Sequence, residues 1–307
     1  MDRLQRLQIF VAVAETSGFA AAARHLGLSP PVVTRAIAGL EEHLGVRLFQ
    51  RTTRKVRLTG AGGRYLLDCK RLLGELQDAE AAVAGTQGEL RGEFALTASV
   101  QFGSLFVAPL LLKFLRQHPA VSLRLLLLDR VVNLIDEGVD IAVRIARLPD
   151  STLTAARVGQ MRRVVCASPE YLEANGVPER PRDLLAHRTL MATPERTAAA
   201  WVFGDGQRKT PVKPSAQLFV NSTEVAVQGA VAGNGLTRVL YYMVAADLRA
   251  GRLKLVLEDY EPAPLPIHVV HREGRSAPGR VRACVDYLVE HLRRDPAVNP
   301  LAARKRR

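Results

Sequence analysis

Residues 29–45 read SPPVVTRAIAGLEEHLG, in which a serine and two prolines precede an apolar repeat. Serine is a preferred cap of helix amides, and proline is favoured at the first helical position because the N–H that it lacks has no acceptor there. Apolar residues then recur at spacings of four, three and four, the period of one buried helical face: Val33, Ile37, Leu40 and Leu44. Glycine commonly ends helices, and Gly45 ends this pattern. The sequence therefore predicts a helix whose first turn is made rigid by two prolines and is capped by the Ser29 hydroxyl.

Two shorter helical segments precede this helix. A first helix is predicted by apolar residues at spacings of three and four: Leu4, Leu7, Phe10, Val11 and Ala14. The alanine-rich residues 19–27 predict a second helix, whose small side chains allow close packing. A turn with Gly27 then leads into the 29–45 helix, whose N-terminal end exposes Pro31, Val32, Thr34 and Arg35. This order is typical of a helix-turn-helix, whose second helix contacts base edges in the major groove. A plain helical hairpin with a solvated Arg35 fits this stretch equally well.

The next segment favours DNA binding. Residues 47–59, RLFQRTTRKVRLT, hold five basic residues and no acidic one. Their apolar alternation predicts two short strands with Arg54 and Lys55 at the turn between them. Such a wing contacts phosphates or enters the minor groove, where cationic side chains are attracted. Helix and wing together predict a winged helix-turn-helix that binds duplex DNA.

The overall charge is consistent with a polyanionic partner. The chain has 307 residues and a net charge of +13, while its 48% apolar and 24% charged residues are those of a globular protein. Residues 1–60 and 293–307 each carry a net charge of +5, so the excess lies at the two ends. No apolar run approaches the roughly 18 residues of a spanning helix, and no export signal is recognisable. The expected location is the cytoplasm.

A helix is predicted to follow the wing, over residues 60–85. Its apolar residues keep a heptad spacing, which is typical of a coiled seam: Tyr65, Cys69, Leu72, Leu76, Ala79 and Val83. We expect this seam to join two copies, because one winged unit reads only half of a palindromic site. The alternative is a helix packed on its own domain. Residues 85–92, GTQGELRG, are the expected hinge.

From Phe94 onward, segments with strand character alternate with segments of helical character, among which residues 130–138 are expected to be helical. Strands separated by single helices predict parallel sheets with right-handed crossovers. Ligands of such folds bind beyond the carboxyl ends of the strands. The fold class is therefore α/β behind an N-terminal winged helix-turn-helix.

No motif for catalysis occurs, and no cofactor or metal site is expected: the sequence lacks a GxSxG elbow, a P-loop, an HExxH motif and a zinc ligand set. The three cysteines, Cys69, Cys166 and Cys284, are widely spaced and form no disulfide framework. A redox sensor built on Cys166 and Cys284 is a weak alternative, because neither has a resolving partner close in sequence.

The first 62 residues, from FVAVAETSGF through RTTRKVRLTGAG, closely resemble the DNA-binding domain of LysR-type transcriptional regulators. The resemblance implies that the DNA-facing positions lie at the start of the second helix of the motif and in the wing: Ser29, Pro31, Thr34 and Arg35, then Arg51 and Arg54. The expected DNA-binding set also includes their neighbours Pro30, Val32, Thr53 and Lys55. Members of the family often have a glutamine where this chain has Pro30. Because proline cannot hydrogen-bond to a base, Arg35 is the better candidate for direct readout.

The C-terminal part also resembles this family, whose effector domain is similar to a two-lobed type 2 periplasmic binding protein. The resemblance implies a DNA-binding domain at 1–59, a linker helix and hinge at 60–91 that dimerises, and an effector domain at 92–293. Lobe I would comprise 92–163 and 266–293, and lobe II 164–265. Cleft residues that suit a small anionic or aromatic effector follow from this pattern: Ser99, Gln101, Phe102, Ser104, Arg147, Asn221, Ser222 and Thr223. Ser99 and Ser222 are equally compatible with a role as helix caps.

The expected function is a ligand-responsive, sequence-specific transcriptional regulator that is not an enzyme. Its expected partners are double-stranded DNA at an inverted repeat, a small effector and RNA polymerase. The chain is also expected to assemble with copies of itself, as a dimer or a tetramer. The rival hypothesis is a nonspecific architectural DNA-binding protein whose α/β half serves only assembly. Residues 294–307 are expected to be a disordered basic tail that attracts phosphates, and a surface with no role fits them equally well.

Overall fold

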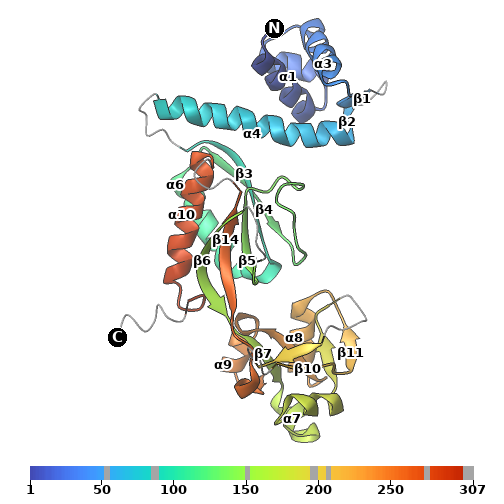
Figure 1. Ribbon diagram of the computed structural model, residues 1–307, viewed down its shortest axis with the longest axis vertical. Helices are drawn as coiled ribbons and strands as arrows, with labels where there is room; N and C mark the ends of the chain where they lie inside the picture. Colours follow the sequence, from blue (N-terminus) through green and yellow to red (C-terminus); the bar gives the residue numbers. More distant parts are fainter. Residues whose placement is uncertain are drawn as a thin grey trace.

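The computed structural model describes residues 1–51, 56–83, 90–148, 153–193, 200–204, 209–272 and 277–299. The N-terminal unit lies at one end of an elongated molecule, the helix α4 crosses beneath it, and two α/β lobes follow (Figure 1). The predicted order of winged helix-turn-helix, linker helix and two-lobed effector domain is therefore confirmed.

The N-terminal unit packs three helices and a two-stranded hairpin around one apolar core. Its elements are α1 (Arg3–Thr16), α2 (Phe19–Leu26), α3 (Pro30–Leu44), β1 (Phe49–Arg51) and β2 (Val56–Leu58). The ring of Phe10 on α1 lies 5.3 Å from that of Phe49 on β1 and 5.3 Å from that of Tyr65 on α4. These rings join the hairpin and α4 to the three helices, and such ring pairs add to the stabilisation from burial.

Helix α4 (Gly60–Val83) begins in contact with the hairpin. Thr59 accepts the amide hydrogen of Gly62 at 2.9 Å and donates its hydroxyl to the carbonyl of Arg47 at 2.8 Å. A methyl group on Gly62 would overlap the carbonyl oxygen of Leu48. Glycine at position 62 thus allows α4 to approach the backbone that leads into β1.

The first half of α4 packs within its own chain. Cys69 has no exposed surface and belongs to the core of the N-terminal unit, and Tyr65 packs against that core. The assignment of Cys69 to the seam between two copies is therefore wrong, whereas Tyr65 keeps a partly exposed surface. The heptad spacing is real, but a period alone does not tell which surface it contacts. Leu72 is exposed and Leu76 is partly exposed; the side chains of Ala79 and Val83 lie outside the described residues.

A second face of α4 contacts lobe I. The ammonium of Lys70 lies 2.6 Å from the carboxylate of Glu15 on α1 and 3.8 Å from that of Glu93 in lobe I. A methyl group on Gly74 would meet the guanidinium of Arg280 at 2.7 Å, and one on Gly138 would meet Leu67 at 2.8 Å. Close contact at these points joins the DNA-binding unit, the linker and the effector domain.

In the described residues, lobe I is built on a five-stranded sheet in the order β4-β3-β5-β14-β6. The strands are β3 (Gly92–Ala98), β4 (Val121–Leu127), β5 (Ile141–Ile145), β6 (Thr154–Met161) and β14 (Leu265–His271). One face packs against α5 (Val100–Phe102), the π-helical turn η1 (Gly103–Val107), α6 (Ala108–Gln117) and α10 (Gly279–Arg294).

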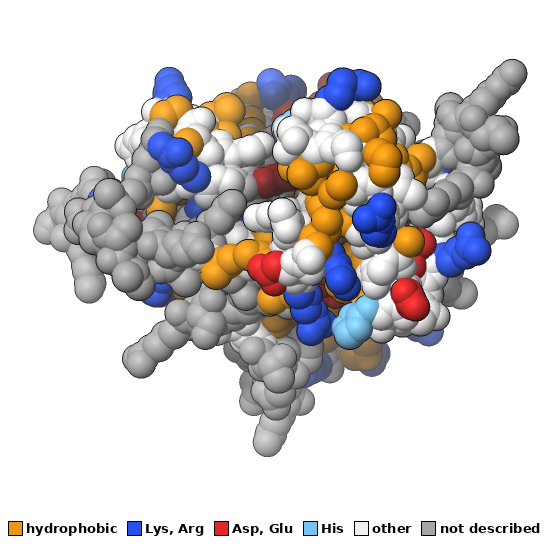
Figure 2. Space-filling view, turned by 90° about the horizontal axis from the view of Figure 1, so that it is seen from above, with side chains coloured by type: hydrophobic (Ala, Val, Ile, Leu, Met, Phe, Trp, Pro, Cys, Tyr) orange, Lys and Arg blue, Asp and Glu red, His pale blue; other side chains and the backbone are white. Residues whose placement is uncertain are grey.

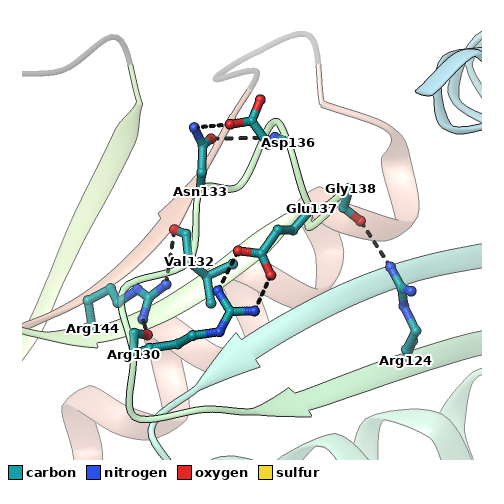
Figure 3. Close-up of polar contacts among 8 residues, drawn as sticks. All are labelled: Arg124, Arg130, Val132, Asn133, Asp136, Glu137, Gly138 and Arg144. Atoms are coloured by element: carbon teal, nitrogen blue, oxygen red, sulfur yellow. Dashed lines mark hydrogen bonds and ion pairs between the residues drawn. The ribbon is translucent and has the colours of Figure 1, made fainter. Parts of the chain in front are cut away.

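The other face of this sheet is covered by the segment from 128 to 140. It forms turns rather than the predicted helix. Arg130 forms two hydrogen bonds with the carboxylate of Glu137, at 2.7 and 2.6 Å, while Arg144 donates to the carbonyl of Val132 at 3.3 Å (Figure 3). Asn133 accepts the amide of Ile135 at 3.0 Å. The amide of Glu137 still donates to the carbonyl of Asn133 at 3.1 Å, so one helical turn forms, and side-chain hydrogen bonds hold the rest of the segment. Sequence periodicity does not register this competition.

Lobe II has, in its described part, a second five-stranded sheet in the order β11-β8-β12-β7-β13. Its strands are β7 (Arg163–Ala167), β8 (Thr189–Met191), β11 (Ala216–Phe219), β12 (Leu236–Leu240) and β13 (Lys254–Val256). One face packs on α8 (Thr223–Val231) and α9 (Ala245–Arg249). The other packs on α7 (Pro169–Asn175), η2 (Pro181–Ala186) and the hairpin of β9 (Trp201–Phe203) and β10 (Thr210–Val212).

Both sheets are mixed, so the prediction of parallel sheets holds for only part of each sheet. β3 runs parallel to β4 and β5, but β14 runs antiparallel to β5 and β6. In lobe II, β7 runs antiparallel to β12 and β13. The reason is that the chain crosses between the lobes twice, near Arg162 and between Val256 and Leu265, and each crossing strand enters its sheet against the parallel set.

The start of the predicted tail also departs from expectation. Val298 is fully buried, and its carbonyl accepts the amide hydrogen of Gln160 at 3.1 Å. Asn299 donates to the carbonyl of Arg293 at 3.2 Å. Residues 295–299 therefore pack against β6 because one apolar side chain fills a site in lobe I. Residues 300–307 lie outside the described residues.

The contact between Gly62 and Leu48 gives a stability prediction. Gly62→Ala should lower the free energy of unfolding by about 1–3 kcal/mol, because overpacking forces backbone shifts. Gly63→Ala is the matched control, since a methyl group there meets nothing within 4 Å. It should leave stability unchanged or raise it, as expected for alanine in a helix. Thermal and urea unfolding of both variants checks this, and equal stability of the two would contradict the tight contact.

Candidate DNA-binding surface and effector cleft

The N-terminus of α3 presents polar groups to solvent. Pro30 and Pro31 occupy its first two positions, and Ser29 precedes it in extended conformation without a side-chain hydrogen bond to the helix. The predicted cap by the Ser29 hydroxyl is therefore wrong. Pro31 removes one of the two amides from which a cap accepts, and the other, that of Val32, donates to the Ser29 carbonyl at 3.0 Å. The exposed hydroxyl of Ser29 is left for another partner.

Thr34 and Arg35 lie exposed on the next turn of this helix, opposite the buried Val33 and Ile37. The hydroxyl of Thr34 donates to the carbonyl of Pro30 at 3.0 Å. Because its hydrogen is used there, the oxygen presents lone pairs outward and suits a donor on a base or a solvent molecule. Val32, which was also predicted to face DNA, is half-buried.

The hairpin that was predicted as a wing is present. Arg51 pairs with Val56 across the antiparallel strands β1 and β2. A single carboxylate oxygen of Glu41 on α3 accepts the amides of Leu48 and Phe49 at 2.8 and 3.1 Å, which fixes the hairpin relative to α3. Hydrogen bonds to charged groups stabilise by roughly 1.5–3 kcal/mol each. The side chain of Arg51, together with Thr53, Arg54 and Lys55, lies outside the described residues.

Seen from above, this end of the molecule shows Lys and Arg side chains spread around a band of hydrophobic ones (Figure 2). Exposed basic residues near the hairpin include Arg47 and Arg57, and Arg24 is exposed on α2. A surface that combines cationic side chains with the start of an exposed helix has the chemistry that duplex DNA requires.

The predicted cleft residues follow strand ends that meet the two crossings between the lobes, near Arg162 and between Val256 and Leu265, which are called the hinge from here on. Most of the hinge predicted earlier at 85–92 lies outside the described residues. β5 pairs with β14 so that Ile145 lies opposite Ile267, close to the crossing before Leu265, and β3 runs parallel to β5. Ser99 and Arg147, which follow β3 and β5, therefore lie at the hinge edge of lobe I. In lobe II, β11 and β12 both run parallel to β8, and β12 ends at the hinge. Asn221, which follows β11, lies at that edge too.

The hinge edge of lobe I already holds a carboxylate. Asp129 accepts the amide hydrogen of Val100, the first residue of α5, at 3.0 Å. Ser99 makes no side-chain cap hydrogen bond at this helix start, so the capping alternative does not apply to it. Asp129 was missed because it lies 29 residues further along the chain. Its negative charge disfavours the binding of an anionic group at the start of α5.

Two predicted cleft residues have other roles. Phe102 is fully buried, with its ring 4.8 Å from that of Phe106 and 5.5 Å from that of Tyr242, so its assignment as an effector contact is wrong. Ser104 donates its hydroxyl to the carbonyl of Val100 at 2.9 Å, within its own turn. Gln101 remains partly exposed.

Tyr242 is a residue that the sequence reasoning missed. It follows β12 of lobe II but packs into the core of lobe I. Burial raises the pKa of its hydroxyl, and the nearby Ser99 side chain opposes that shift. The ring therefore joins the two lobes beside the predicted cleft, which no local signal in the sequence indicates.

On the lobe II side, Ser222 caps α8 by accepting the amide hydrogen of Val225 at 3.4 Å. The capping alternative thus holds for Ser222. Asn221 is exposed, and Thr223 begins the helix with partial exposure. Asn221 and Thr223 remain accessible polar groups at this edge.

The cysteines have no features of a redox site. All three are fully buried, and burial raises the pKa of Cys69 to about 11 and those of Cys166 and Cys284 to about 12. A thiol is reactive as its thiolate, which these shifts disfavour. Among the described residues there is no group of His, Cys, Asp or Glu side chains that could hold a metal ion. No helix in the described ranges is long and apolar enough to span a membrane.

Known proteins resemble this chain over nearly its whole length. It is 38% identical over 294 residues to an HTH-type transcriptional regulator of Xanthomonas campestris pv. campestris, which covers 94% of this chain and 85% of that protein. It is 30% identical to the HTH-type transcriptional activator AaeR of Escherichia coli, with 95% and 94% covered. The solved structure of CrgA, a LysR-type transcriptional regulator from Neisseria meningitidis, matches with a TM-score of 0.59 and 31% identity over 95% of this chain and 99% of that one.

Two family models account for the two halves. The model described as bacterial regulatory helix-turn-helix protein, lysR family, matches residues 4–63, which hold α1 to β2 and the start of α4. The model described as LysR substrate binding domain matches residues 87–293, which hold both lobes. With an exposed recognition helix, a wing and a two-lobed effector domain in this order, the chain belongs to the LysR family of transcriptional regulators.

Proposed function

We propose that this regulator reads its operator with the N-terminal end of α3. The observation that carries the proposal is that this end of the helix is exposed and that two prolines fix its backbone. Its contacts would come from Ser29, Pro30, Pro31, Thr34 and Arg35, with Val32 at the margin. Arg35 supplies a guanidinium suited to guanine, and Thr34 supplies an acceptor. Pro30 and Pro31 contribute apolar surface and a fixed backbone.

The wing residues Arg51, Thr53, Arg54 and Lys55 would bind the sugar-phosphate backbone beside this groove. The link from Glu41 to the start of β1 supports this role, because it fixes the hairpin relative to α3. Phosphate contacts position a protein on duplex DNA and add little sequence preference.

The active assembly would hold two such units on an inverted repeat, as a dimer or as a tetramer. The surface available for pairing is the face of α4 with Leu72 and Leu76, continuing toward Ala79 and Val83. Leu72 is 44% exposed, so a partner that covers it would remove apolar surface from water. Cys69 is excluded from this face by its burial, and Tyr65 packs against the core of its own N-terminal unit.

A small effector would bind at the hinge between the lobes, near Ser99, Gln101, Arg147, Asn221 and Thr223. Asp129 makes the lobe I side favour a donor or a cationic group, so an anionic group of the effector would face lobe II. Differential affinity for two arrangements of the lobes would then change the spacing of the DNA-binding units. We infer that this takes place in the cytoplasm, where such a regulator meets DNA and RNA polymerase.

The function is tested by selecting bound sequences from a random DNA pool with the full-length protein, followed by footprinting with and without candidate metabolites. A selected inverted repeat whose footprint changes with one compound is the expected result. Even protection of unrelated DNA would favour the architectural alternative instead.

Arg35 gives the sharpest test of the reading surface. Arg35→Ala should lose preference at one base pair of each half-site, at a cost of about 1–3 kcal/mol for a bidentate base contact. Arg54→Ala serves as the comparison, since loss of a phosphate contact should weaken all sequences about equally and reduce the salt dependence. Competition binding against single-base operator variants measures both. An unchanged selected motif for Arg35→Ala would show that this face does not read the bases.

The pairing surface is tested with Leu72→Glu. The change should convert the assembly to smaller species and lower operator affinity at least about tenfold, because single half-sites then bind alone. Analytical ultracentrifugation and operator binding measure this. Val177→Glu is the control, since Val177 is 60% exposed in lobe II, far along the chain from α4. If Leu72→Glu retained the wild-type mass and affinity, the face of α4 would have another role.

A further inference from the structure

Two arginines lie side by side on one face of the lobe II sheet. β7 and β12 run antiparallel with Arg163 opposite Leu240 and Val165 opposite Arg238. Arg163 and Arg238 are therefore diagonal neighbours, which places their Cα atoms roughly 7–8 Å apart. They share the face with Val165, Trp201 and Phe203, and this face is opposite to the one that α8 covers. The site thus differs from the Asn221–Thr223 edge that opens α8.

The guanidinium of Arg238 is fixed in position by its neighbours, but no carboxylate in the described residues pairs with its charge. Its Nη2 donates to the carbonyl of Val202 at 2.7 Å, and its carbon lies 5.0 Å from the centre of the Phe203 ring and 5.9 Å from that of Trp201. Its Nε is buried without a hydrogen-bond partner in the described part of the chain. Burial and the charge of Arg163 lower the pKa of Arg238 to about 10.

Arg163 is the accessible member of the pair. It is exposed at the start of β7, yet desolvation lowers its pKa, and no carboxylate within the described ranges opposes that effect. Arg162, one residue earlier, shows the contrast: it binds the carboxylate of Glu261 at 2.8 and 2.7 Å and that of Glu258 at 2.9 Å. Two like charges next to each other destabilise a fold unless a counter-charge is supplied.

We propose that Arg163 and Arg238 form a binding site for the oxyanion of a small molecule, a carboxylate or a phosphate, on the face of lobe II covered by the β9–β10 hairpin. Arg163 would contribute its exposed guanidinium, and Arg238, which is partly exposed, would contribute the N–H groups of Nη1, which make no hydrogen bond within the described residues. The rings of Phe203 and Trp201 keep Arg238 in place. Arginine forks bind both kinds of anion with charge-assisted hydrogen bonds. The site lies at the end of the sheet that adjoins the hinge, because Leu240, opposite Arg163, is followed at once by Tyr241 and Tyr242, which pack against the core of lobe I.

The test uses the full-length protein and thermal unfolding at constant ionic strength, with inorganic phosphate or sodium benzoate replacing chloride. In wild type, at least one of the two anions at millimolar concentration should raise the Tm by about 3 °C or more. Arg163→Gln should lose this rise, and Arg163→Lys should keep part of it. Arg116→Gln, which removes an exposed arginine of α6, should respond as wild type does.

Without added anion at low ionic strength, Arg163→Gln should be at least as stable as wild type, because it removes an unbalanced charge. A phosphate response alone identifies a phosphate ligand, and a benzoate response identifies a carboxylate. Ser99→Val separates this site from the effector cleft, since the anion response should persist in that variant. The proposal is overturned if neither anion stabilises wild type, if Arg163→Gln responds as wild type does, or if its fold is weakened without anion. None of these results depends on the choice of operator.

Discussion

The structure depends on one helix that packs on two partners at once. One face of α4 carries Tyr65 and Cys69 into the core of the DNA-binding unit, and the adjacent face carries Leu67 and Gly74 onto lobe I. Small residues make the second contact possible, because Gly74 and Gly138 leave room for Arg280 and Leu67. A helix buried on two sides has little freedom to rotate about its axis. The position of lobe I is therefore tied through α4 to that of the N-terminal unit.

The same packing limits what remains for assembly. Since two faces of α4 are used within the chain, the exposed face with Leu72 is what a second copy has available. Lys70 strengthens the internal arrangement by reaching carboxylates on α1 and on β3. Surface ion pairs stabilise by roughly 1 kcal/mol or less, so burial of apolar side chains supplies most of the free energy of this junction.

How much the sequence predicts depends on whether a feature is local. The helix from Pro30 to Leu44 and the hairpin were predictable, because spacing, prolines and basic turn residues all lie within one short segment. The role of Tyr65 and Cys69 was not, since a heptad pattern is the same whether it packs on its own core or on a partner. Phe102 and Tyr242 meet across the hinge although 140 positions separate them in number. The Ser29 cap failed for a local reason, the missing amide of Pro31.

Some charged and polar groups of this chain have hydrogen-bond or ion-pair partners within it, and others have none in the described residues. Glu41, Asp129 and Arg162 meet their partners within the chain, and they hold the hairpin, the start of α5 and the hinge in place. Removing a partner from such a group is costly because a desolvated charge is left behind. Arg163 and the Nε of Arg238 have no such partner in the described residues, although their desolvation is as real. Two carboxylates neutralise Arg162, whereas the adjacent Arg163 has no carboxylate partner in the described residues. The charge of Arg163 is therefore available to the oxyanion proposed above.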